Sequence, residues 1–101
     1  MTEAEKVIFK DAIMVYGVDS QVDMAIEEMS ELTKALLKYR RVKNGDESVD
    51  HKYKALDNLI EEIEDVQIML DQLELIYGHN DGIREHKVYR LKERLKGEIK
   101  C

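Results

Sequence analysis

The absence of proline constrains this chain most, because none of its 101 residues carries the ring that breaks an α-helix. The strong breaks that remain are the glycines at positions 17, 45, 78, 82 and 97. Between them, apolar residues recur every three or four positions, a spacing typical of amphipathic helices. We therefore expect an all-α fold.

The capping residues set the expected helix boundaries. We predict four helices, over about residues 2–15, 20–42, 48–77 and 82–96. Asp19 or Ser20 is expected to cap the second helix and Ser48 the third, while Gly78 suits the position after the third helix. The resulting architecture is a bundle-like arrangement of four helices within one domain that spans residues 1–101.

Several observations limit where the chain acts and what it binds. No apolar run approaches the ~18 residues that cross a membrane, and the acidic N-terminus lacks the apolar stretch of a signal peptide. Cys101 is the only cysteine, so no internal disulfide can form. We expect a cytoplasmic protein with no membrane partner. A chain of this length buries a limited core, and a second copy would extend it.

The net charge of −6 argues against a nucleic-acid partner, because phosphate backbones bind basic surfaces. An acidic protein that binds a phosphorylated ligand needs a metal cation between the two negative charges. The distribution of the acidic residues therefore decides which ligands are plausible.

Two acids of the second helix face in an unexpected direction. A helical wheel at 100° per residue predicts a core stripe of Val22, Ile26, Met29, Thr33, Leu36 and Arg40. The solvent stripe holds Asp23, Glu27, Ser30, Lys34, Lys38 and Arg41. Glu28 and Glu31 belong to neither stripe. They share a third sector with Gln21, Met24, Ala35 and Val42, and this sector is apolar enough to be covered.

The third helix repeats this arrangement. Its expected core stripe is Leu59, Ile63, Val66, Leu70, Leu73 and Tyr77. Glu62 and Asp65 lie at the border of the stripe, three residues apart on one face. Ile68 and Leu75 point outward at a seven-residue spacing, which predicts a contact surface for self-association.

Carboxylates near a core are costly unless they are paired or bind a metal. Two such pairs on two packed helices suit Mg²⁺ or Mn²⁺, hard ions that prefer oxygen ligands. A di-iron centre would need Glu-x-x-His pairs, whereas the residues three before the histidines are Ser48, Ile76 and Ile83. The same histidines offer no zinc spacing. A solvated acidic surface without a metal is the alternative, since 22 residues are acidic.

The two acidic segments also resemble a known family. Residues 27–32 read EEMSEL and residues 61–66 read EEIEDV, which is similar to the EExxE and ExxD motifs of MazG-like nucleoside triphosphate pyrophosphohydrolases. The resemblance extends from Gly17 to Lys96 and includes the basic segment 87–95. It implies an all-α MazG-type domain that assembles as a dimer or tetramer and hydrolyses nucleoside triphosphates to monophosphate and pyrophosphate. That activity serves nucleotide-pool sanitation or control of deoxynucleotide levels.

The resemblance also implies a set of site residues. The metal ligands would be Glu28, Glu31, Glu62 and Asp65, with Glu28 or Glu31 also activating the water that attacks the α-phosphorus. Glu27 matches the first glutamate of the motif but turns toward solvent, so we expect it to support the ligands or bind a second ion.

Two further groups of residues are candidates for substrate contacts. Lys87, Arg90 and Arg94 share one helical face and would bind phosphate, or else form an ordinary solvated basic face. Gln21 and Asn58 carry amides that can bind a base edge. A phosphoribosyl-ATP pyrophosphatase is a related alternative. A helical oligomerisation or adaptor module without enzymatic activity is the alternative of a different class.

Overall fold

The computed structural model describes residues 1–99, and these form four α-helices without a β-strand. The helices are α1 (Glu3–Tyr16), α2 (Val18–Lys43), α3 (Val49–Tyr77) and α4 (Asp81–Glu98). The all-α prediction is therefore confirmed, with boundaries within two residues of those expected. Cys101 lies outside the described residues.

Side-chain caps begin three of the helices. Thr2 and Glu5 form a reciprocal capping box at α1, Ser48 accepts from the backbone N–H of His51 at α3, and Asn80 accepts from that of Ile83 at α4. The predicted cap at Asp19 or Ser20 is wrong. Helix α2 begins at Val18, directly after Gly17, which has no side chain to cap it and whose φ of 93° favours glycine.

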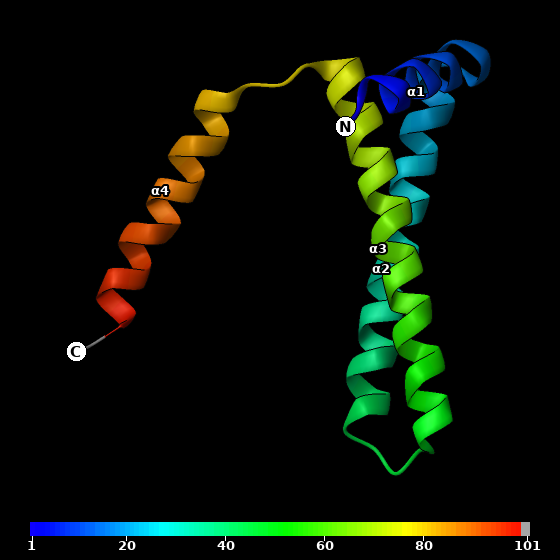
Figure 1. The fold of residues 1–101 in the computed structure, drawn as a ribbon, viewed down its shortest axis with the longest axis vertical. Coiled ribbons are helices and arrows are strands. Elements are labelled where there is room, and N and C mark those ends of the chain that lie inside the picture. Colours follow the sequence, from blue (N-terminus) through cyan, green and yellow to red (C-terminus); the bar gives the residue numbers. More distant parts are fainter. Residues whose placement is uncertain (100–101) are drawn as a thin grey trace.

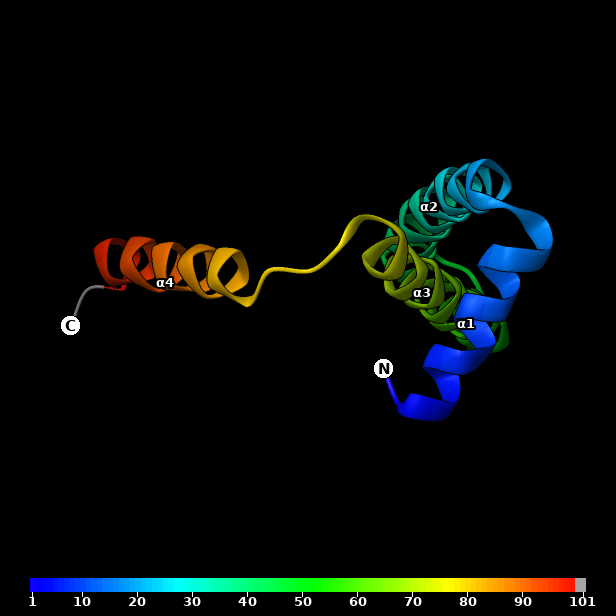
Figure 2. The same ribbon diagram turned by 90° about the horizontal axis from the view of Figure 1, so that it is seen from above.

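Helices α2 and α3 form an antiparallel hairpin closed by residues 44–48, and α1 crosses its open end in contact with both (Figure 1). Helix α4 stands apart and contacts none of the other three. Seen from above, α1 and α4 lie on opposite sides of the α2–α3 pair (Figure 2). The expected four-helix arrangement is thus only partly realised: within one chain, three helices pack and the fourth does not.

The hairpin is held together by one row of side chains on each helix, which we call the core seam. On α2 it comprises Gln21, Ala25, Glu28, Leu32, Ala35, Tyr39 and Val42. On α3 it comprises Ala55, Leu59, Glu62, Val66, Met69, Leu73 and Ile76. Every member is buried or half-buried, and the spacing alternates between three and four residues, as in coiled coils. Each row therefore faces the other helix along the length of the hairpin.

The core stripe predicted for the second helix is wrong by one residue. Ile26, Met29, Thr33, Leu36 and Arg40 are exposed, and Val22 is half-buried. The residues that pack on α3 precede them and include Ala25 and Ala35. The prediction that the third sector is covered is correct in part, because Gln21, Ala35 and Val42 are buried while Met24 is exposed. The packed positions of α2 are occupied by alanines and not by the larger apolar residues, because small side chains let the two helices approach closely.

The prediction for the third helix is correct at Leu59 and Val66, which are buried, and Leu73 is half-buried. It is wrong at Ile63, Leu70 and Tyr77, which are exposed because they lie one residue beyond the core seam. Of the two outward residues, Ile68 is exposed as expected. Leu75 is instead half-buried at the end of the hairpin where α1 packs.

The joint between α3 and α4 is short and ordered by local bonds. Gly78, with φ of 105°, ends α3 by donating its N–H to the carbonyl of Glu74. The imidazole of His79 lies between the carboxylates of Glu74, at 3.5 Å, and Asp81. Together with the Asn80 cap, these contacts order the joint from which α4 leaves the hairpin.

None of the helices in the described part of the chain combines the length and the apolarity needed to cross a membrane.

A buried amide pair beside the core seam yields a stability prediction. Gln21 donates from Nε2 to Oε1 of Gln72 at 2.6 Å, and Gln21 is only 7% exposed. Gln72→Ala leaves the Gln21 amide without its partner and should cost about 1–3 kcal/mol of unfolding free energy, measured by urea titration. Replacing both glutamines by leucine should cost less than this single change.

The matched control for this prediction is Gln67→Ala, because Gln67 is an exposed glutamine on the same helix. We expect it to change stability by less than about 0.5 kcal/mol. Equal losses for the Gln72 and Gln67 variants would show that the buried pair contributes nothing specific.

The contacts of His79 at the α3–α4 joint predict how its imidazole titrates. Hydrogen bonding to Asp81, and then the charges of Glu74 and Asp81, raise the pKa of His79 above 6.5. The protonated imidazole therefore bridges the two carboxylates at low pH, and this contribution is lost as the pH rises through the raised pKa. In an NMR titration, Asp81→Asn should lower the pKa of His79 more than Glu74→Gln does. An unchanged value in both variants would contradict the bridge.

Candidate metal centre

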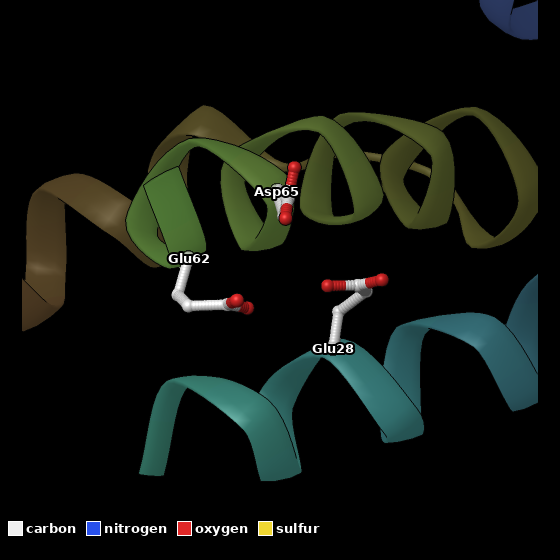
Figure 3. Close-up of side chains that lie close together, drawn as sticks. All are labelled: Glu28, Glu62 and Asp65. Carbon is white, nitrogen blue, oxygen red and sulfur yellow. The ribbon is translucent and has the colours of Figure 1, made fainter. Parts of the chain in front are cut away.

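Three carboxylates meet halfway along the hairpin, between α2 and α3 (Figure 3). Glu28 comes from the core seam of α2 and Glu62 from that of α3, while Asp65 follows Glu62 by one helical turn. Because α2 and α3 run antiparallel along matched seams, the middle of one helix faces the middle of the other. The packing of the helices therefore brings the acids of two distant sequence segments together.

The geometry is that of a compact oxygen cluster. One carboxylate oxygen from each of the three side chains lies within 4.8 Å of the other two. Glu28 and Glu62 are half-buried and Asp65 is exposed, so the cluster is supported by the core and open to solvent on one side. Oε2 of Glu62 is buried and makes no hydrogen bond. A buried oxygen without a partner is the atom a metal ion would satisfy.

The carboxylates are electrostatically unfavourable as they stand. Partial burial, followed by the charges of Asp65 and Glu62, raises the pKa of Glu28 above its usual value of 4.5. Partial burial, followed by the charges of Asp65 and Glu31, raises the pKa of Glu62. Both shifts have the same two physical causes: partial burial first, and then repulsion by neighbouring negative charges.

No basic side chain of the described residues offsets this charge. The ion pairs found within residues 1–99 join His79 to Glu74 and Asp81, and Lys96 to Glu93. All of them lie at the α3–α4 joint or on α4. The three-carboxylate cluster is therefore unneutralised, and its donors are the hard oxygens that Mg²⁺ and Mn²⁺ bind.

The structure brings together three of the four residues expected to bind metal. Glu31, the fourth, is exposed and lies outside the compact group, although its charge reaches both Glu28 and Glu62. Glu27 is exposed, as expected, and its charge acts on Glu28. Glu31 and Glu27 are thus exposed carboxylates near the cluster and not members of it.

The expected substrate-contact residues are distributed differently. Lys87, Arg90 and Arg94 are exposed on α4, which does not touch α2 or α3, so a single chain does not bring them to the acidic cluster. Asn58 is exposed one turn before Glu62. Gln21, by contrast, is buried with its amide bonded to Gln72.

Gln72 is the polar residue that the sequence analysis did not single out. It is buried and donates a long contact of 3.9 Å to Sδ of Met69 in addition to pairing with Gln21. A glutamine beside the apolar positions of α3 was the available signal, but its partner lies 51 residues away in sequence. Only the packed hairpin reveals the pair.

Comparison with known proteins assigns no relative: no family model matches the chain, and neither the curated proteins nor the solved structures contain a significant match. The function must therefore be inferred from the site and from the sequence motifs themselves.

The unneutralised cluster predicts how stability responds to charge and metal. Glu62→Gln removes a charge that repels Asp65 and Glu31, so the melting temperature in EDTA should rise. Mg²⁺ should stabilise the wild-type protein, by about 2.7 kcal/mol at a concentration one hundred times Kd, and should stabilise the variant much less.

Glu64→Gln is the matched control, because Glu64 is exposed on the same helix and lies outside the cluster. This variant should respond to Mg²⁺ as the wild-type protein does. A Glu62→Gln variant that Mg²⁺ stabilises as strongly as the wild type would contradict a metal site at this position.

Proposed function

We propose that this protein is a Mg²⁺-dependent hydrolase that converts nucleoside or deoxynucleoside triphosphates to the monophosphate and pyrophosphate. The observation that carries the proposal is the cluster of Glu28, Glu62 and Asp65, whose oxygens lie within 4.8 Å of one another without a neutralising cation. The order and spacing of the acidic motifs, which resemble those of MazG-like enzymes, supply the reaction type.

The charge of the chain fits this chemistry only with a metal. A protein with a net charge of −6 repels a triphosphate unless divalent cations lie between them. When bound, Mg²⁺ neutralises phosphate oxygens and lowers the pKa of a coordinated water. Glu28, Glu62 and Asp65 would hold the ion at the exposed edge of the hairpin, where a phosphate chain has access.

Glu31 is the carboxylate best placed to act on water. It is exposed, is absent from the compact group of three, and lies near enough for its charge to affect Glu28 and Glu62. It would orient the attacking water and accept its proton as the new bond to the α-phosphorus forms. The bond between the α-phosphorus and its bridging oxygen breaks, and pyrophosphate leaves.

A second candidate function is an oligomerisation or adaptor module, favoured by the exposed apolar side chains along α2, α3 and α4. The two candidates differ in what the acids do. An adaptor tolerates amide substitutions in the cluster, whereas the enzyme loses turnover with them.

The enzymatic proposal predicts Mg²⁺-dependent pyrophosphate release from at least one member of a panel of ribo- and deoxynucleoside triphosphates. EDTA should abolish release, and Glu62→Gln should lower kcat/KM by at least about 100-fold, because it removes a ligand from the ion. Glu64→Gln should retain activity. Absence of release from every nucleotide, with folded protein and with Mg²⁺ or Mn²⁺, would favour the adaptor.

A further inference from the structure

Helix α4 carries an apolar row that no other helix within residues 1–99 contacts. Val88, Leu91 and Leu95 recur at spacings of three and four residues, so they lie on one face of the helix, and each is exposed. Together with Ile99 they line one apolar hollow. A helix of 18 residues is only marginally stable in water by itself, because most of the stability of protein helices comes from packing an apolar face. The row on α4 therefore needs a surface on which to pack.

Helix α3 presents an exposed row of side chains on the face that α1 leaves open. Each residue of this row, which we call the outer row, comes one position after a core-seam residue and so lies beside the seam. On the other side of the seam, Gln72 and Leu75 come one position before core-seam residues, and they are buried or half-buried at the end of the hairpin where α1 packs. The outer row comprises Ile60, Ile63, Gln67, Leu70, Glu74 and Tyr77, all of them exposed.

The joint between α3 and α4 suits an antiparallel pair of helices. Only residues 78–80 separate them, and connections of this length in helical proteins usually join antiparallel neighbours. Figure 1 shows α4 running back in the direction opposite to α3, at an angle to it. Gly78, with φ of 105°, has the backbone freedom of glycine, and the space beside it is open. A rotation at this joint therefore brings α4 alongside α3.

The two rows match in register when α4 lies antiparallel along α3. With Asp81 level with Tyr77, residues equally far from the joint face each other. From Arg84, the row on α4 advances by four, three and four residues; from Glu74, the outer row on α3 recedes by four, three and four. The side chains therefore meet in pairs along both helices: Arg84 meets Glu74, Val88 meets Leu70, Leu91 meets Gln67 and Leu95 meets Ile63.

The charges of the two helices are complementary as well. Helix α3 carries eight acidic and two basic side chains, whereas α4 carries six basic and four acidic ones. Among the paired positions, Arg84 and Glu74 are the charged residues, and they fall at the same level. Both already line one hollow at the joint. An ion pair at the joint end and apolar contacts beyond it would therefore stabilise the same register.

We propose that α4 is a strap that closes about the joint at residues 78–80 and packs its apolar row on the outer row of its own α3. In the closed form Val88 and Leu95 are covered, and Arg84 pairs with Glu74. Asp65 comes one position before a core-seam residue and so lies on the other face of α3, which means that closing leaves the acidic cluster accessible. The closure holds whether or not the proposed catalytic function does.

The test is disulfide trapping in the full chain, with Cys101→Ser so that no other thiol is present. Ile63→Cys and Leu95→Cys place two thiols at the same level of the closed form, so they should form a disulfide within one chain under mild oxidation. The product should keep the mass of a single chain, 11.8 kDa, and its rate of formation should not depend on protein concentration.

The matched control combines Ile63→Cys with Val88→Cys, which moves the second thiol by seven residues, or about 10 Å along the helix axis. Its disulfide should form at least about 10-fold more slowly. Adding Arg84→Glu should slow trapping of the first pair about threefold, and adding Glu74→Arg to that variant should restore the rate. Circular dichroism should show native helix content in every variant.

Three results would overturn the proposal. Equal trapping rates in the two cysteine pairs would show that α4 moves without a fixed closed form. No trapping in either pair would show that α4 stays apart from α3. Trapping only between chains would show that a second copy, and not the α4 of the same chain, covers the outer row.

Discussion

The antiparallel packing of α2 on α3 along the core seam is the constraint on which the rest of the structure depends. Small residues such as Ala25, Ala35 and Ala55 bring the helices close together, and none of the largest side chains is fully buried. A seam of this kind would ordinarily be apolar throughout. Here Glu28 and Glu62 occupy seam positions, so the same contact that stabilises the hairpin also presses carboxylates together. The acidic cluster is therefore a consequence of the helix packing and not an addition to the surface of the hairpin.

In this arrangement, binding of a divalent cation would increase the stability of the fold. Half-buried carboxylates without a counter-charge destabilise the fold because they repel one another. A divalent cation between them would attract each carboxylate and offset this repulsion. The two faces of the hairpin then differ in character. One carries α1 and the charged residues around the cluster, and the other carries exposed apolar residues such as Ile26, Ile63 and Leu70. A single pair of helices thereby presents acidic side chains on one face and apolar side chains on the other, because residues one position before and one position after the core seam point to opposite faces.

Sequence periodicity predicted the helices well, but it predicted the packed side of α3 only in part and that of α2 wrongly. The absence of proline and the caps at Ser48 and Gly78 define element boundaries locally, and the structure agrees with them. In α2, however, two seams one residue apart are both compatible with a heptad spacing, and the larger side chains of Ile26 and Met29 favoured the wrong one. The face of α2 that packs is instead the one whose alanines allow close contact with α3, and this cannot be seen from the sequence of α2 alone. The separation of α4 from the other helices was equally beyond prediction, because helical periodicity does not indicate which helices pack against each other.

The acidic site could be predicted in part from the sequence, because its acids depart from the apolar and polar periodicity of their helices. Glu28 and Glu62 were singled out as acids next to apolar neighbours, and both lie in the cluster. Glu31 shares their motif but lies at the solvent side, a distinction that motif spacing does not make. A crystal structure with Mn²⁺ tests the proposed metal site directly, through the anomalous scattering of the ion. We expect an anomalous peak within bonding distance of Glu28, Glu62 and Asp65, between α2 and α3. Carboxylates that hold no ion, at saturating Mn²⁺ and neutral pH, would contradict it.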